Sequence, residues 1–125
     1  MIEFKRNSAR ASLAELPPLT QTPGYTVLRG DPRASVMLAH GEANSRTRLG
    51  TWRCTEGAFR CTEKGDELQT ITQGRLRIER EDGSSTVFEP GDSFFTRKGE
   101  ILVWDVIETV EKVFFTYDTD GAQDG

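Results

Sequence analysis

The sequence is poor in histidine, cysteine and long apolar runs, and each shortage excludes a class of protein. It contains one histidine and two cysteines in 125 residues. A single imidazole excludes a metal site built from several histidines, and two cysteines do not make a disulfide scaffold. The N-terminus has no apolar stretch of signal-peptide length, and nowhere do about 18 apolar residues run together as in a membrane span. We therefore expect a cytoplasmic protein that does not contact a membrane.

An excess of positive charge is also missing. The chain has 16 basic and 20 acidic residues, for a net charge of −4, and the two signs are interspersed. Without a basic stripe to meet a phosphate backbone, nucleic acid is not an expected partner. His40 ends a short apolar run, where a histidine is usually structural or exposed. Ser84, Ser85 and Ser93 have no histidine partner for nucleophilic catalysis.

The chain does contain a regular series of turn signals. They stand at Gly50, Gly57, Gly65, Gly74, Asp82-Gly83, Gly91-Asp92 and Lys98-Gly99. The runs between them are short and rich in Val, Ile, Phe, Thr and Trp, which indicates a sandwich or barrel rather than βαβ units. We expect an extended N-terminal arm (1–20), one β-barrel (21–120) and a flexible tail (121–125). The arm is expected to pair with a sheet edge of its own or of another subunit.

Three of these turn signals predict hairpins, and the hairpins predict which side chains face inward. A two-residue turn at Gln73-Gly74 opposes Ile71 with Leu76, Gln69 with Ile78, and Glu67 with Arg80. A turn at Asp82-Gly83 opposes Ile78 with Val87 and agrees with that inner face. A third turn, at Glu56-Gly57 or Gly57-Ala58, puts Cys54 and Cys61 on one face, either as buried hydrophobes, as a redox pair or as a soft-metal site.

Parity extends the inner face to the neighbouring strands and predicts a ligand-binding interior. Its residues are Trp52, Cys61, Glu63, Glu67, Gln69, Arg80, Leu102 and Trp104. The outward set is Arg53, Arg60, Arg75, Arg77 and Glu79. A concave apolar site with a few convergent polar groups is where small ligands usually bind. In the alternative reading, Glu67 and Arg80 only neutralise one another and the tryptophans are core.

Two segments carry a resemblance to a known family. Glu67 is followed by six residues and Gly74, and GDSFFTRKGEIL begins at Gly91 and turns at Lys98-Gly99. Together they resemble the two motifs of the cupin superfamily, and Trp104 leading into VIETVEKVFF is similar to the small cupins related to ureidoglycine aminohydrolase and the ethanolamine-utilisation Q protein. The resemblance covers roughly residues 48–117. It implies an all-β, RmlC-like jelly-roll barrel of about nine to eleven strands.

The resemblance also implies where a metal would bind, and the ligands are largely replaced. The motif histidines fall on Cys61, Glu63 and Leu102, and the motif proline falls on Arg97; Glu67 alone is retained. We therefore expect no metal cofactor. The alternative is a divalent metal held by Cys61, Glu63 and Glu67, a mixed set that is unusual for zinc.

Three functions follow as hypotheses. The first is a metal-independent cupin that binds a small polar or anionic molecule, with Arg80 and Arg97 as partners for an anion. The second is an aminohydrolase-like or other small-metabolite enzyme, either with a non-standard metal site or with a glutamate as general acid or base. The third is a structural dimer without a ligand. A homodimer is expected in any case, since symmetric dimers are the commonest oligomers.

Overall fold

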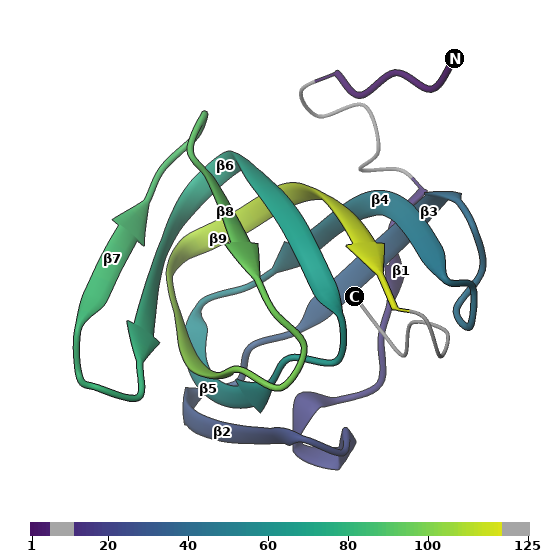
Figure 1. The fold of residues 1–125 in the computed structure, drawn as a ribbon. Helices are drawn as coiled ribbons and strands as arrows, with labels where there is room; N and C mark the ends of the chain where they lie inside the picture. The colour runs from purple at the N-terminus through teal and green to yellow at the C-terminus, as the bar shows by residue number, and fades with distance from the viewer. Residues whose placement is uncertain (6–11, 119–125) are drawn as a thin grey trace.

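The computed structural model describes residues 1–5 and 12–118, and these form an all-β barrel (Figure 1). The elements are β1 (Ala14–Glu15), η2 (Leu19–Gln21), β2 (Tyr25–Gly30), β3 (Ala34–His40), β4 (Thr47–Cys54), β5 (Gly57–Thr62), β6 (Asp66–Arg80), β7 (Ser85–Phe88), β8 (Ser93–Thr96) and β9 (Ile101–Tyr117). These nine strands of the described residues confirm the predicted fold class and strand number. No helix in the described ranges has the length and hydropathy to cross a membrane.

The two longest strands organise the barrel. β6 and β9 pair antiparallel along almost their whole length and curve together, as Figure 1 shows. The first half of β6 also pairs with β8, and its second half pairs with β7. Likewise β4 pairs with the second half of β9, and β5 with its first half. The sheet therefore bends into two layers, with strand orders β1-β3-β4-β9-β6-β8 and β2-β5-β9-β6-β7.

The predicted hairpin at Gln73-Gly74 is wrong, because β6 continues through these two residues without reversing its direction. The pairing of β6 with β9 shifts register three times between Ile71 and Leu76, so the strand bends there instead of turning back. Gly74 has a φ of +87°, and a Cβ at this position would lie 2.1 Å from the carbonyl oxygen of Thr109. The glycine is therefore required by a close approach of two strands within a bend.

The hairpin predicted between the two cysteines is also wrong. β4 and β5 do not pair with each other; both pair with β9, where Cys54 lies opposite Val110 and Gly57 opposite Val106. The chain therefore continues in one direction and passes from one layer to the other at residues 55–56. The inward placement of Cys54 and Cys61 is nevertheless found, since both are buried.

The turn at Asp82-Gly83 exists, but its register differs from the predicted one. Gly83 takes a φ of +88° in a three-residue loop, and its N–H donates to the carbonyl of Arg80. Ile78 consequently lies opposite Thr86 rather than Val87. The one-residue shift turns Val87 outward, where it is 40% exposed.

Residues 14–19 of the N-terminal segment lie against the barrel. Ala14 and Glu15 pair antiparallel with β3 of the same chain, and Leu19 is buried in the core. The predicted flexible tail, residues 121–125, lies outside the described residues. The core between the layers is apolar and contains Ile71, Leu76, Ile78, Val106, Val110 and Phe114.

Candidate functional site

A small hollow of about 10 Å³ lies in the barrel interior, between the two layers. Its walls are aromatic: Tyr25 on β2, Trp52 on β4, Phe59 on β5 and Trp104 on β9. Its polar groups are Cys61, Glu63, Glu67 and Lys112. Because typical ligand sites enclose roughly 300–1,000 Å³ and one water molecule needs about 10–15 Å³, this hollow has room for a group of about the size of one water molecule, such as the polar end of a larger molecule.

Lys112 lies at the centre of one polar group of the site. Its Nζ donates to Oε2 of Glu67 over 2.6 Å and also to Oε1 of Gln69. The same ammonium lies 4.7 Å from the ring centroid of Trp52 and 4.8 Å from that of Trp104. Gln69 in turn donates from Nε2 to Thr96. Since buried charge is tolerated when it is paired and hydrogen-bonded, Lys112 and Glu67 stabilise one another out of water.

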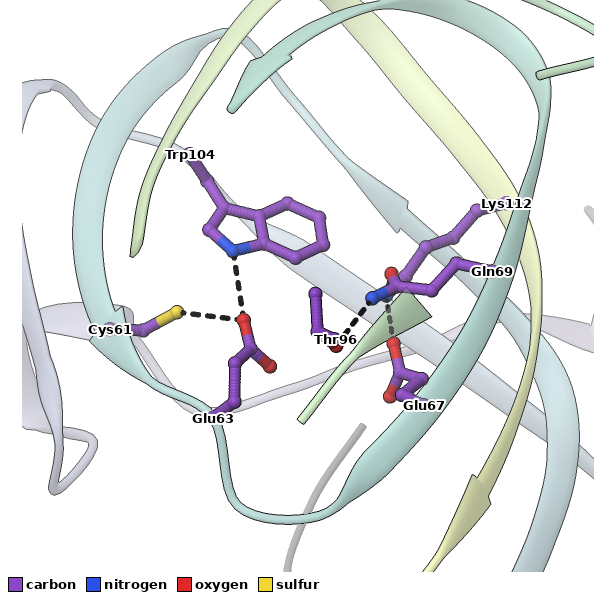
Figure 2. A network of polar contacts seen from close by, with 7 residues as sticks. All are labelled: Cys61, Glu63, Glu67, Gln69, Thr96, Trp104 and Lys112. Atoms are coloured by element: carbon purple, nitrogen blue, oxygen red, sulfur yellow. Dashed lines mark hydrogen bonds and ion pairs between the residues drawn. The ribbon is translucent and has the colours of Figure 1, made fainter. Parts of the chain in front are cut away.

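Glu63 carries the second polar group, across the interior from the first (Figure 2). Its Oε1 accepts hydrogen bonds from Nε1 of Trp104 at 3.0 Å and from the thiol of Cys61 at 3.4 Å. Its backbone is fixed by hydrogen bonds with Gly99 and Glu100 in the turn before β9. Burial, followed by the charge of Glu67, raises the pKa of Glu63 to about 7. The half-buried carboxyl therefore exchanges its proton near neutral pH.

The thiols of Cys54 and Cys61 are buried and are expected to be unreactive. Burial raises the pKa of Cys54 to about 12, and burial with the neighbouring charge of Glu63 raises the pKa of Cys61 even more. Both cysteines are free. A thiol that stays protonated is a poor nucleophile and a poor metal ligand, which favours the reading of both residues as small buried hydrophobes.

The donor set fits a metal poorly. Among the described residues, no group of three His, Cys, Asp or Glu side chains is placed to hold a metal ion together. Glu67 already shares its charge with the Lys112 ammonium, which sits where a cation would bind it. Leu102, at a motif histidine position, has no donor atom. The proposed set of Cys61, Glu63 and Glu67 is therefore not assembled as a metal site.

The structure brings five of the eight predicted ligand-binding residues to the hollow. They are Trp52, Cys61, Glu63, Glu67 and Trp104. Gln69 is buried behind Lys112, and Leu102 is buried beside Cys61. The placement of Arg80 in the interior is wrong: its side chain is exposed and donates to Ser84 and Thr86. Glu67 and Arg80 lie on different layers, because the hairpin that would have opposed them does not form.

Sequence reasoning missed three residues of the site, namely Tyr25, Phe59 and Lys112. A signal for Lys112 existed. The inward residues of β9 fall at even positions from Leu102 through Trp104 and Val106, and the same parity resumes at Val110 and Lys112. A lysine at an inward strand position marks a buried charge that needs a partner.

Several solved structures share this fold. EutQ of Clostridium difficile is 20% identical, with a TM-score of 0.61 over 76% of this chain and 82% of that one. A putative ethanolamine utilization protein Q from Salmonella typhimurium is 18% identical, with a TM-score of 0.58 over 70% of each chain. A DUF861 protein of unknown function from Pseudomonas syringae is 23% identical, with a TM-score of 0.72 over 83% of this chain but 43% of that one. No functionally curated protein matches the chain.

The bent two-layer β-barrel has the cupin fold. More narrowly, the chain belongs to the EutQ-like cupin domain family, whose sequence profile matches residues 41–114. The predicted cupin assignment is thereby confirmed. Because folds of this kind host many chemistries, family membership does not by itself define an activity.

Proposed function

We propose that this cupin binds a small polar organic molecule in the barrel interior without a metal ion. The observation that carries the proposal is the placement of Lys112, whose ammonium is bonded to Glu67 and Gln69 inside an aromatic cage. In this arrangement the ammonium of Lys112 neutralises the carboxylate of Glu67, so that Glu67 does not need a metal ion as its partner. The remaining carboxyl, Glu63, faces the hollow and is available to orient a ligand.

The test combines metal analysis with ligand screening. Protein purified without an affinity tag is analysed by native mass spectrometry and elemental analysis, and we expect no stoichiometric transition metal. A thermal-shift screen of small amines, ureides and carboxylates is expected to give at least one ligand that raises the melting temperature, because binding to the native state stabilises it. Near-unit metal that survives dialysis and is lost in Glu67→Ala would overturn the metal-independent part. A screen without any hit would favour a structural role.

The protonation of Glu63 near neutrality favours a second candidate, a metal-free enzyme in which this carboxyl transfers protons. Hydrolytic release of ammonia from small ureides and amino compounds is the reaction class to assay. Turnover that follows the ionisation of Glu63 and is lost in Glu63→Gln would establish it. Turnover unchanged in that variant would exclude Glu63 as the group that transfers the proton.

We also propose a homodimer that packs through one outer sheet face. Phe95, Leu68 and Phe115 are neighbours on β8, β6 and β9, and Leu49 on β4 continues the row. The first three are 53%, 52% and 42% exposed. By contrast, the outer face of the other layer carries the ion pairs of Asp105 with Arg29 and Arg77. An exposed apolar row is typical of a surface that another molecule covers, and a symmetric copy of the row is its simplest partner.

Sedimentation velocity at micromolar concentration tests the dimer. We expect a dimer for the native chain and a monomer for Leu68→Lys. Ile107→Lys is the matched control, because Ile107 is exposed on β9 outside this row and 38% accessible. A native chain that stays monomeric, or dissociation in the control variant alone, would contradict the assigned face.

A further inference from the structure

A second hollow, with mainly apolar walls, lies next to the interior hollow and beneath the N-terminal segment. This second hollow, of about 200 Å³, is lined by side chains that include Leu16, Pro17, Leu19 and Pro23. Tyr25 and Trp52 line both hollows. The same two aromatic side chains therefore border both hollows, of which one is apolar and the other carries the carboxyl groups.

The charges of the polar end do not cancel. Two carboxyl groups, Glu63 and Glu67, and one cation, Lys112, line the interior hollow. Lys112 is committed to Glu67 at 2.6 Å. The oxygen Oε2 of Glu63 has no hydrogen-bond partner among the described residues. Another cation, Lys64, lies 5.9 Å from the Tyr25 ring centroid and does not line the hollow. An anion would meet an uncompensated carboxylate here, whereas a cation would neutralise it.

The aromatic walls of the interior hollow also favour a positively charged ligand group. The Lys112 ammonium already lies near the rings of Trp52 and Trp104, which demonstrates that this cage accepts a cation. Phe59 stacks on Trp104 at a centroid distance of 6.0 Å and extends the aromatic surface on the Glu63 side. Ring faces combined with a carboxylate favour an organic ammonium group over a neutral or anionic head.

We infer that the ligand is an amphipathic primary amine. Its ammonium group binds Glu63 between the aromatic rings, and its hydrocarbon part passes Tyr25 and Trp52 into the apolar hollow. This assignment rests on the proposed binding function and narrows it to one class of ligand. It replaces the anion expected from the sequence, because Arg80 points away from the interior and Arg97 is exposed.

Isothermal titration of the full chain with three six-carbon probes tests the charge. We expect n-hexylamine to bind, n-hexanol to bind at least tenfold more weakly, and hexanoate not to bind. Glu63→Gln should weaken hexylamine binding at least tenfold, while the exposed control Glu79→Gln should leave it unchanged. Hexanoate binding, or hexylamine binding equal in Glu63→Gln, would overturn the amine assignment and leave the proposed binding function standing. No binding by any probe, together with an empty screen, would overturn both.

The apolar half of the proposal has its own test. From methylamine to n-hexylamine, affinity should rise about three- to fourfold with each methylene group, as burial of a methylene predicts. Leu16→Trp narrows the apolar hollow at a half-buried position and should remove this dependence without changing methylamine binding. Thermal unfolding of each variant checks that it is folded. A chain-length dependence that is flat in the native chain, or unchanged in folded Leu16→Trp, would place the hydrocarbon elsewhere.

Discussion

Lys112 and Glu67 form an ion pair of 2.6 Å in the barrel interior, where the two residues are 2% and 5% exposed. The pair joins β9 to β6 at the edge of the bend. It gives the molecule a buried cation and a buried anion within one polar network that also includes Gln69. Such a pair is costly to break and less costly to replace as a unit.

Lys112→Met should therefore destabilise the protein by about 3–5 kcal/mol, because Glu67 is left buried without its partner. The double variant Lys112→Met/Glu67→Gln should recover part of this loss, since no unpaired charge remains. Urea unfolding of the native chain, both single variants and the double variant gives the coupling free energy. Additive single effects would show that the two side chains do not stabilise one another.

Glu63→Gln should change how stability depends on pH. The pKa of Glu63 is raised from 4.5 to about 7 in the folded protein, so between these values the folded protein binds more protons here than the unfolded chain. Its free energy of unfolding consequently falls as pH rises through this window. The glutamine variant should lack this fall and gain on the order of 1–2 kcal/mol over the native chain at pH 8. Unfolding series at pH 5 and pH 8 decide it; equal pH dependence of the two proteins would contradict the assignment.

Gly74→Ala should destabilise the barrel by about 3 kcal/mol or more, because positive φ and a close approach act together. Gly83 provides a matched control: its φ is +88°, close to the +87° of Gly74, but an added Cβ there meets nothing within 4 Å. Gly83→Ala should cost only about 1 kcal/mol. Similar losses of unfolding free energy in the two variants would mean that the contact with Thr109 does not matter.

The two thiols should resist modification in the folded protein. Both cysteines are buried and their thiol pKa values are raised, so the reactive thiolate is scarce at neutral pH. A disulfide-exchange reagent is expected to label none in the native protein and both after unfolding in urea. Rapid labelling of either thiol without denaturant would indicate that the interior is open, and would revive the redox reading.

Sequence patterns predicted the inward face of β4, β5, the first part of β6 and the first part of β9, but not which strands pair. Ile71 and Leu76 face inward whether the chain turns at Gly74 or bends there, since a two-residue hairpin and the observed run of bulges both switch parity. A positive φ at Gly74 is compatible with both a hairpin turn and the observed bend. Local signals therefore could not choose between a hairpin and a 15-residue strand, because the choice depends on β9, which lies more than twenty residues further on.

For the candidate site too, the sequence predicted which side chains face inward but not which residues lie opposite one another. Trp52, Cys61, Glu63, Glu67 and Trp104 were found through parity, and parity survives an error in pairing. Arg80 was misplaced because its role depended on which residue lay opposite, and Lys112 was missed because the inward parity of its strand was not followed beyond the first half. Where a charge is buried, its partner is fixed by tertiary packing and not by its neighbours in sequence.

The position of β9 bears on how the chain can fold during synthesis. The last described strand lies in the middle of the sheet, so β4 and β5 each lack one neighbour until Ile101–Tyr117 has been made. Much of the pairing is therefore postponed until Ile101–Tyr117 has been synthesised, which is the behaviour of a topology dominated by non-local contacts. We expect a chain ending at residue 100 to show the far-ultraviolet circular dichroism of an unfolded polypeptide. On the ribosome, the edges of β4 and β5 that later pair with β9 would therefore stay unpaired and accessible to chaperones until β9 has been synthesised.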